Sequence, residues 1–178
     1  MKISYIILAK GQSNRLKNKN KRNFLGKPMF LWNTEKCVDL GDTYVSSDSD
    51  EILELAEKAG ATGIKRPITL CGNTPNIPCY QHAYPFMGLP DVLIAVQANS
   101  PTLKIEKIVR AQQLAMREDF KELMTIHSDT SIYGSIWAMT ANRLMSYPDP
   151  YNPKPNYLMI DDSVDIHDEK DLIRAQND

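Results

Sequence analysis

Positively charged side chains gather in one short stretch that follows an apolar run near the start of the chain. A glycine there allows the backbone to approach a ligand closely, and a serine hydroxyl with neighbouring N–H groups can bind phosphate oxygens. The spacing therefore predicts binding of a polyphosphate, although a solvated surface loop or an RNA-binding patch would also fit. It matches neither G-x-x-x-x-G-K-[ST] nor G-x-G-x-x-G, the usual phosphate and dinucleotide patterns. The residues concerned are Lys10, Gly11, Ser13, Arg15, Lys19 and Arg22.

Asp165 and His167 are the best candidates for metal ligands. In the stretch 163–167, Val164 and Ile166 would face one side of a strand, and Asp165 and His167 the other. Two such side chains at a sheet edge can share a divalent cation. The carboxylate suits Mg²⁺, whereas an imidazole suits Mn²⁺ better. Asp168 is expected to cap the last helix instead of binding metal.

The positive charge is local, because the chain as a whole is nearly neutral. Its 178 residues carry a net charge of −1, with 42% hydrophobic and 24% charged residues, as in ordinary soluble proteins. Eight of the 21 Lys and Arg residues lie in 1–34, whereas all 22 acidic residues follow Thr34. A local field predicts a small anionic ligand, and nothing in the total charge points to nucleic acid.

The cysteines and the apolar N-terminus limit the cellular setting. Cys37, Cys71 and Cys79 have no metal-type spacing and are odd in number, so we expect reduced thiols and a cytoplasmic protein. The apolar run 5–9 is too short for a signal sequence or a membrane span.

Apolar runs alternate with amphipathic stretches along the chain. Strands are expected at 3–9, 43–48, 91–100, 122–128, 133–140, 156–161 and 163–167, and helices at 27–40, 49–61, 104–118 and 168–177. The Pro- and Gly-rich stretch 66–90 predicts a long loop with a broken helix. This alternation predicts one α/β domain over residues 1–178, with three α/β/α layers and a mainly parallel mixed sheet. Ligands would bind at the carboxyl ends of its strands.

Six blocks, in this order, resemble the cytidylyltransferases that activate acidic sugars, which make CMP-sialic acid and, more distantly, CMP-KDO. They are IILAKGQSNRLKNKN, VSSDSDEILELAEKAGA, KRPITLCGNTPNI, VQANSPTL, SIYGSIWAMT and SVDIHDEKDLIRAQ. The resemblance implies a Rossmann-like nucleotide-diphospho-sugar transferase fold. It also implies transfer of CMP from CTP to an acidic, sialic acid-like sugar with release of pyrophosphate, aided by Mg²⁺ or Mn²⁺.

The resemblance also assigns residues to roles. It implies catalytic roles for Lys19 and Asp165 and a metal pair of Asp165 and His167. The implied nucleotide-binding residues are Ala9, Lys10, Gly11, Ser13, Arg15, Lys19, Asn20, Arg66 and Gln97.

The chain departs from the family pattern at several positions. Lys10 stands where the family has Arg, Asn73 where it has Asp, and His167 where it has a second Asp. Few residues separate the strands expected at 122–128 and 133–140, where the family inserts an arm for dimerisation. We therefore expect a monomer or a non-standard dimer. A different nucleotide, a non-sugar acceptor, or a catalytically degenerate nucleotide-binding homologue are the alternatives.

Overall fold

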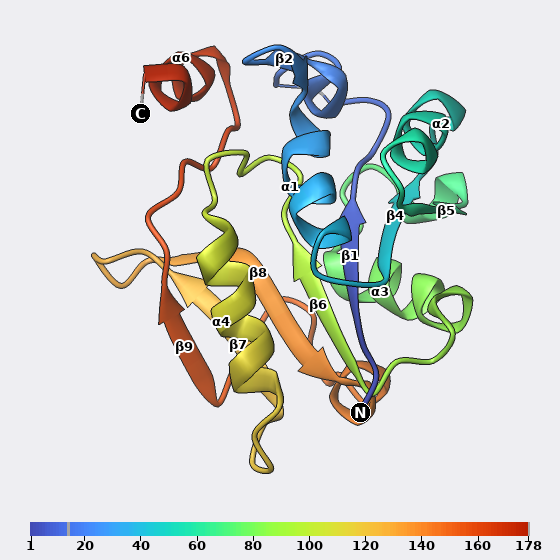
Figure 1. Cartoon of the computed structure of the whole chain (residues 1–178), viewed down its shortest axis with the longest axis vertical. Helices are drawn as coiled ribbons and strands as arrows, with labels where there is room; N and C mark the ends of the chain where they lie inside the picture. The colour runs from blue at the N-terminus through green and yellow to red at the C-terminus, as the bar shows by residue number, and fades with distance from the viewer. Residues whose placement is uncertain (14, 178) are drawn as a thin grey trace.

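A twisted seven-stranded sheet forms the centre of the computed structural model, which describes residues 1–13 and 15–177 (Figure 1). The strands lie in the order β5-β4-β1-β6-β8-β7-β9. Only β8 runs antiparallel to its neighbours, so the predicted mainly parallel mixed sheet is confirmed. The strands are β1 (Ile3–Leu8), β4 (Thr43–Ser47), β5 (Thr62–Lys65), β6 (Val92–Val96), β7 (Glu122–Ile126), β8 (Ile132–Thr140) and β9 (Tyr157–Ile160).

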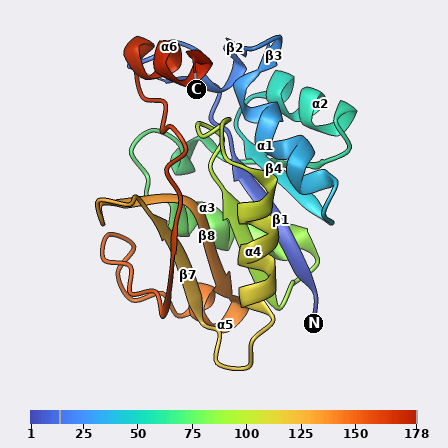
Figure 2. The same cartoon turned by 60° about the vertical axis from the view of Figure 1, so that its left-hand side comes forward.

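Helices cover both faces of the sheet and complete the three predicted layers (Figures 1 and 2). One face packs against α1 (Met29–Val38), α2 (Asp50–Lys58) and α4 (Ile105–Ala115). The other packs against α3 (Asn76–Ala83) and α5 (Ala141–Met145). The central strands β1 and β6 are apolar on both faces because both are covered.

A third apolar cluster joins the beginning and the end of the chain. The closing helix α6 (Glu169–Asn177) contributes Leu172 and Ala175, which share this cluster with Leu16 and Phe24 of the N-terminal loop. The basic loop therefore packs beneath the C-terminal segment, although the two are far apart in sequence.

The segment 163–167 is not a strand, and this prediction was wrong. Its backbone partner is the loop after β6: the Val164 N–H donates to Thr102 Oγ1 at 3.0 Å and the Ile166 N–H to the Asn99 carbonyl at 2.9 Å. The predicted alternation still holds, because Val164 and Ile166 are buried and Asp165 is more exposed. An extended segment that hydrogen-bonds to a loop can bury every second side chain, as a strand does, without belonging to a sheet.

Several short elements were not predicted. They are β5, α5, the hairpin of β2 (Asn23–Phe24) with β3 (Lys27–Pro28), and the 3₁₀ turn η1 (Lys19–Lys21). Pro28 immediately precedes α1 instead of lying in its first turn. The stretch 66–90 holds η2 (Ile68–Leu70), α3 and η3 (Tyr84–Met87), so the broken helix is confirmed.

Two further expectations concern connections and caps. Residues 127–131 alone connect β7 to β8, so no arm is inserted there. Asp168 caps α6 as predicted, since its Oδ1 accepts the N–H groups of Lys170 and Asp171. Within the described part of the chain, no helix has both the length and the apolarity needed to cross a bilayer.

Two side chains of α1 hold the loop that follows β6. Asn33 is fully buried and donates to the carbonyls of Gln97 and Ser100, each at 2.8 Å. Lys36 Nζ donates to the carbonyls of Pro101 and Leu103 at 2.9 and 2.6 Å. Hydrogen bonds from α1 therefore fix the loop that carries Gln97.

We expect Asn33→Ala to lower the free energy of unfolding by about 2 kcal/mol, because two buried carbonyls lose their donor. Urea unfolding followed by circular dichroism measures this change. Asn152→Ala, at an exposed position, is the control. Equal stability of the two variants would show that Asn33 does not hold the loop.

Candidate functional site

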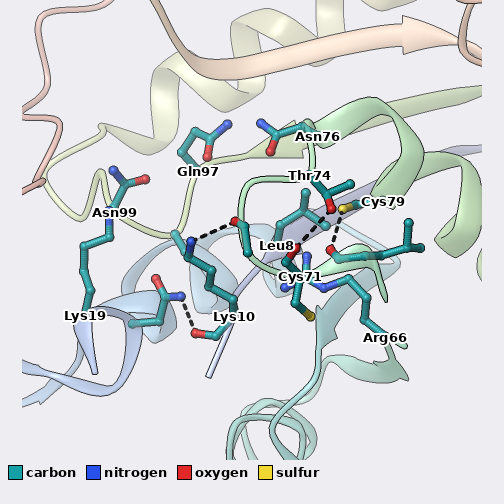
Figure 3. Close-up of a pocket in the computed structure, with 14 residues that line it drawn as sticks. Leu8, Lys10, Lys19, Arg66, Cys71, Thr74, Asn76, Cys79, Gln97 and Asn99 are labelled. Carbon is teal, nitrogen blue, oxygen red and sulfur yellow. Dashed lines mark hydrogen bonds between the residues drawn. The ribbon is translucent and has the colours of Figure 1, made fainter. Parts of the chain in front are cut away.

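A cleft of about 150 Å³ opens at the carboxyl ends of the central strands (Figure 3). Leu8 at the end of β1, Arg66 directly after β5 and Gln97 directly after β6 come together here. The side chains of Lys10, Lys19 and Asn99 lie across the opening from Arg66. The structure brings five of the predicted nucleotide-binding residues together around this one cleft: Lys10, Lys19, Asn20, Arg66 and Gln97.

A second hollow of about 230 Å³ continues the cleft toward the basic loop. Lys10 and Lys19 line both hollows, so their ammonium groups lie at the junction. The predicted residues Ser13, Arg15 and His167 line the second hollow, together with Leu16 and Asn73. The combined cleft extends from Arg66 in the first hollow, past Lys10 and Lys19, to Arg15 in the second hollow, so its positive charge is spread along it.

The basic loop is held by hydrogen bonds from its own backbone. The Ala9 N–H donates to the Ser46 carbonyl at 3.0 Å, and the Gly11 N–H donates to Asp48 Oδ1 at 2.8 Å. These two N–H groups already have acceptors, and Ala9 is fully buried behind the cleft. Ala9 and Gly11, both predicted to bind the nucleotide, line neither hollow and instead tie the loop to the end of β4 and the segment that follows it.

Gly11 is required by its neighbour in the fold. A Cβ added at Gly11 would lie 2.9 Å from Ser49 Cβ, at the N-cap of α2. We expected this glycine to allow close approach of a ligand; the structure shows that it allows close approach of α2.

The buried amide of Asn20 fixes the course of the same loop. Its Nδ2 donates to the Lys10 carbonyl at 2.8 Å, while Lys10 Nζ reaches across to the Gly72 carbonyl at 3.2 Å. Asn20 therefore holds the backbone of Lys10 in place, and the Lys10 side chain links the basic loop to the 66–90 stretch (Figure 3).

The basic residues divide into paired and unpaired ones. Lys21 pairs with Glu51 at 2.5 Å, and Arg22 pairs with Glu169 at 2.6 Å. Lys10, Arg15 and Lys19 form no ion pair with the side chains that the structure describes. Lys10, Arg15 and Lys19 line the cleft, whereas Lys17, which also forms no ion pair with the described side chains, is exposed outside it. Three uncompensated cations along the cleft favour an anion there.

Two polar atoms of the cleft are buried without a partner in residues 1–13 and 15–177. They are Arg66 Nε, in a side chain that is only 4% exposed, and Ser13 Oγ. Buried donors of this kind normally have an acceptor, since leaving one unmet costs about 1–3 kcal/mol. Their location at opposite ends of the cleft points to a ligand that spans it.

Lys19 connects the basic loop to the C-terminal segment. Its Nζ donates to the Ile166 carbonyl at 3.0 Å. Burial lowers the pKa of Lys19, and the carboxylate of Asp165 only partly offsets this effect. A partly desolvated ammonium group gains more from a bound anion than one in open water does.

Asp165 and His167 face each other, as the alternation predicts. His167 Nε2 lies 2.6 Å from Asp165 Oδ2, and the Asn99 amide donates to Asp165 Oδ1. One carboxylate and one imidazole suit Mn²⁺ as well as Mg²⁺, with phosphate oxygens or water as the remaining ligands. Within the described residues, no three His, Cys, Asp or Glu side chains form a metal-binding group. The pair therefore fits a cation that the substrate helps to bind.

Sequence reasoning missed the part played by Asn99 and Asp161. Asn99, a polar residue soon after an apolar strand, lines the cleft and donates to Asp165 Oδ1. Asp161 is 3% exposed and accepts the Ser135 hydroxyl at 2.6 Å and that of Ser163. It fixes the start of the segment that carries Asp165. Ser135, a hydroxyl inside an apolar strand, was the one signal for it.

The cytidylyltransferase family model matches residues 4–145, which include the basic loop, Arg66 and Gln97. The chain belongs to the cytidylyltransferase family. Asp165 and His167 lie beyond the matched residues.

The curated relatives of this family member include enzymes that activate acidic sugars. The chain is 42% identical over 64 residues to the pseudaminic acid cytidylyltransferase of Campylobacter jejuni, covering 34% of the chain and 28% of that protein. It is 28% identical over 124 residues to N-acylneuraminate cytidylyltransferase B of Danio rerio, covering 68% of the chain and 29% of that protein. The matches thus span less than a third of these relatives.

Solved structures share the fold at low identity. CMP:2-keto-3-deoxy-manno-octonic acid synthetase, solved with CTP, has a TM-score of 0.65 at 14% identity and covers 88% of this chain and 80% of its own. Rv0371c from Mycobacterium tuberculosis, solved with manganese, has a TM-score of 0.71 at 8% identity and covers 99% of both chains. These similarities establish the nucleotidyltransferase fold.

We expect Lys19→Met to loosen the C-terminal segment, because Ile166 loses its charged donor. Amide hydrogen exchange in 163–167 should accelerate about tenfold, which corresponds to a hydrogen bond worth roughly 1.4 kcal/mol. Lys17→Met, at an exposed position of the same loop, is the matched control. Identical exchange in both variants would mean that Lys19 does not hold this segment.

Proposed function

We propose that this protein transfers CMP from CTP to a hydroxyl of an acidic, sialic acid-like sugar and releases pyrophosphate. The observation that carries the proposal is the elongated cleft with unpaired Lys10 and Lys19 at its centre and unmet donors on Arg66 and Ser13 at its ends. The names of the curated relatives support the acceptor class.

The two ends of the cleft would hold different parts of CTP. Arg66 and Gln97 line only the first hollow, and they would contact the cytosine or its ribose. Lys10, Ser13 and Lys19 would bind the triphosphate, with Arg15 at the open rim. This order places the α-phosphate near Lys19, between the two ends.

The chemistry requires positioning and charge neutralisation more than covalent catalysis. The sugar hydroxyl attacks the α-phosphorus, and the bond to the β-phosphate oxygen breaks. Lys10 and Lys19 would stabilise the charge that develops on pyrophosphate. Mg²⁺ or Mn²⁺ held by Asp165 and His167 would supply further positive charge beside the α-phosphate.

The free thiols of Cys37, Cys71 and Cys79 support a cytoplasmic location for this reaction.

A pyrophosphate-release screen tests the proposal, with each of CTP, UTP, ATP and GTP combined with a panel of acidic sugars and phosphonates. We expect release with CTP and a nonulosonic acid, and a larger thermal stabilisation by CTP than by the other three nucleotides. Binding of CTP without turnover of any acceptor would favour a nucleotide-binding homologue that has lost catalysis. A preference for another nucleotide would overturn the assigned base specificity.

Lys19→Ala should weaken CTP binding by roughly 1.5–3 kcal/mol, the usual value of a charge-assisted hydrogen bond. The same substitution should also remove a pH dependence of the affinity for CTP. Burial lowers the pKa of Lys19 in the free protein, and bound phosphate would raise it again. CTP binding should therefore take up protons near the lowered pKa, and affinity should fall as pH rises through it.

Calorimetry in buffers of different ionisation enthalpy measures this proton uptake, with Lys17→Ala as the control. Equal uptake by the wild type and Lys19→Ala would contradict the role of Lys19.

His167→Asp should raise Mg²⁺-dependent turnover and reduce any preference for Mn²⁺, because a carboxylate suits the harder cation better than an imidazole does. Turnover with each metal, measured as pyrophosphate release, checks this. His82→Asp, outside the cleft, controls for loss of a histidine. An unchanged metal preference in His167→Asp would show that His167 is not a ligand.

A further inference from the structure

The strand β9 ends the sheet, with β7 on one side and the surface of the molecule on the other (Figure 1). Its sequence, Tyr157–Ile160, contains no charged residue and no proline. Natural proteins usually protect such an edge with a charge, a proline, a bulge or a covering element, because its free N–H and C=O groups can pair with another strand. The strand itself carries neither of the first two safeguards. At its end, Lys107 of α4 donates to the Ile160 carbonyl at 2.7 Å, so that carbonyl already has a partner.

Large apolar side chains are exposed beside the same edge. Leu158 is 60% exposed and Ile160 is 52% exposed. Ile160 is paired with Ile126 of β7, which in turn is paired with Ile132 of β8, and Ile132 is 69% exposed. Paired residues point to the same face, so these four residues form one apolar surface, here called the β9 face.

The β9 face lies beyond the helices of its layer. The residues of α3 and α5 pack against the inner part of the sheet, where Tyr80 and Tyr147 cover Trp137 of β8. A contiguous exposed apolar surface next to an open strand edge is typical of a protein–protein interface.

The charges on either side of β9 indicate which partner fits. Lys154 precedes the strand and Asp162 follows it, and both are exposed. A two-fold axis makes a strand meet its own copy in the antiparallel direction. With the axis at Leu158, Lys154 lies opposite Asp162 of the second copy, because both positions are four residues from Leu158. The strand edge is therefore complementary to itself in charge at Lys154 and Asp162, and in apolar character at Leu158.

We propose that two copies of this chain pair antiparallel along β9, which joins their sheets into one and brings the two β9 faces side by side. Leu158 of each copy lies opposite Leu158 of the other, and Ile160 lies opposite Asn156 and diagonal to Leu158 of the other copy. The pairing uses backbone groups of β9, and it needs no insertion between β7 and β8. It is independent of the proposed reaction.

Sedimentation velocity of the full chain over a range of concentrations tests the proposal. We expect a dimer in the wild type and a monomer in Leu158→Lys and Ile160→Lys, which should fold normally because both side chains are exposed. Phe86→Lys, at a residue 61% exposed on η3, is the matched control and should stay dimeric. A monomeric wild type, or a dimer that both β9 variants leave intact, would overturn the proposal.

A charge reversal tests the antiparallel register. Lys154→Glu and Asp162→Lys should each weaken the dimer, and the double variant should restore it, because each contact then regains opposite charges. Asp162 also accepts the Ser128 N–H at 2.8 Å, so melting temperatures should accompany these measurements. A double variant that is folded but stays monomeric would overturn this pairing.

Discussion

Three parts of the chain meet at Ile166, and the cleft depends on that junction. The Ile166 N–H donates to the Asn99 carbonyl, and its own carbonyl accepts Lys19 Nζ at 3.0 Å and Asn99 Nδ2 at 3.2 Å. Its fully buried side chain packs against Leu16 and Phe24 of the basic loop. One residue thus fixes the basic loop, the loop after β6 and the segment that carries Asp165 relative to one another.

The basic residues of 1–34 have no acidic neighbours in sequence, and the fold brings later glutamates to some of them. Glu51, Glu169 and Glu35 pair with Lys21, Arg22 and Lys27, none of which lines the cleft. Lys19 and Lys36 are instead held by carbonyl oxygens, and burial lowers the pKa of Lys36 to about 8. Carbonyl oxygens orient an ammonium group without cancelling its charge, so Lys19 stays available to an anion.

Much of this arrangement could be predicted from the sequence. The basic loop follows one buried strand and Gln97 follows another, and the carboxyl ends of parallel strands meet at one edge of a sheet, so their proximity follows from topology. The strand before Arg66 was not predicted, so only the family resemblance indicated that Arg66 belongs with them. The alternation in 163–167 correctly placed Asp165 with His167. The absence of a ladder there could not be foreseen, because a loop partner and a strand partner impose the same two-residue period.

Other features depend on contacts that no local pattern records. A glycine is needed at position 11 because Ser49, from a distant part of the chain, lies too close for a side chain. Asp161 accepts hydroxyls from β8 and from the segment that follows it. The strand β5 is short and only partly buried, so its apolar signal is weak. Such features become visible only when distant segments are brought together.

The junction at Ile166 also bears on how the protein is made. Synthesis runs from the N-terminus, so β1 and the basic loop leave the ribosome well before residues 161–175. Until those residues emerge, Leu16 and Phe24 lack their apolar partners and Lys19 lacks its carbonyl acceptor. The basic loop therefore acquires these native contacts only after residues 161–175 have been made. The cleft, whose walls depend on them, forms on the growing chain later than β1 does.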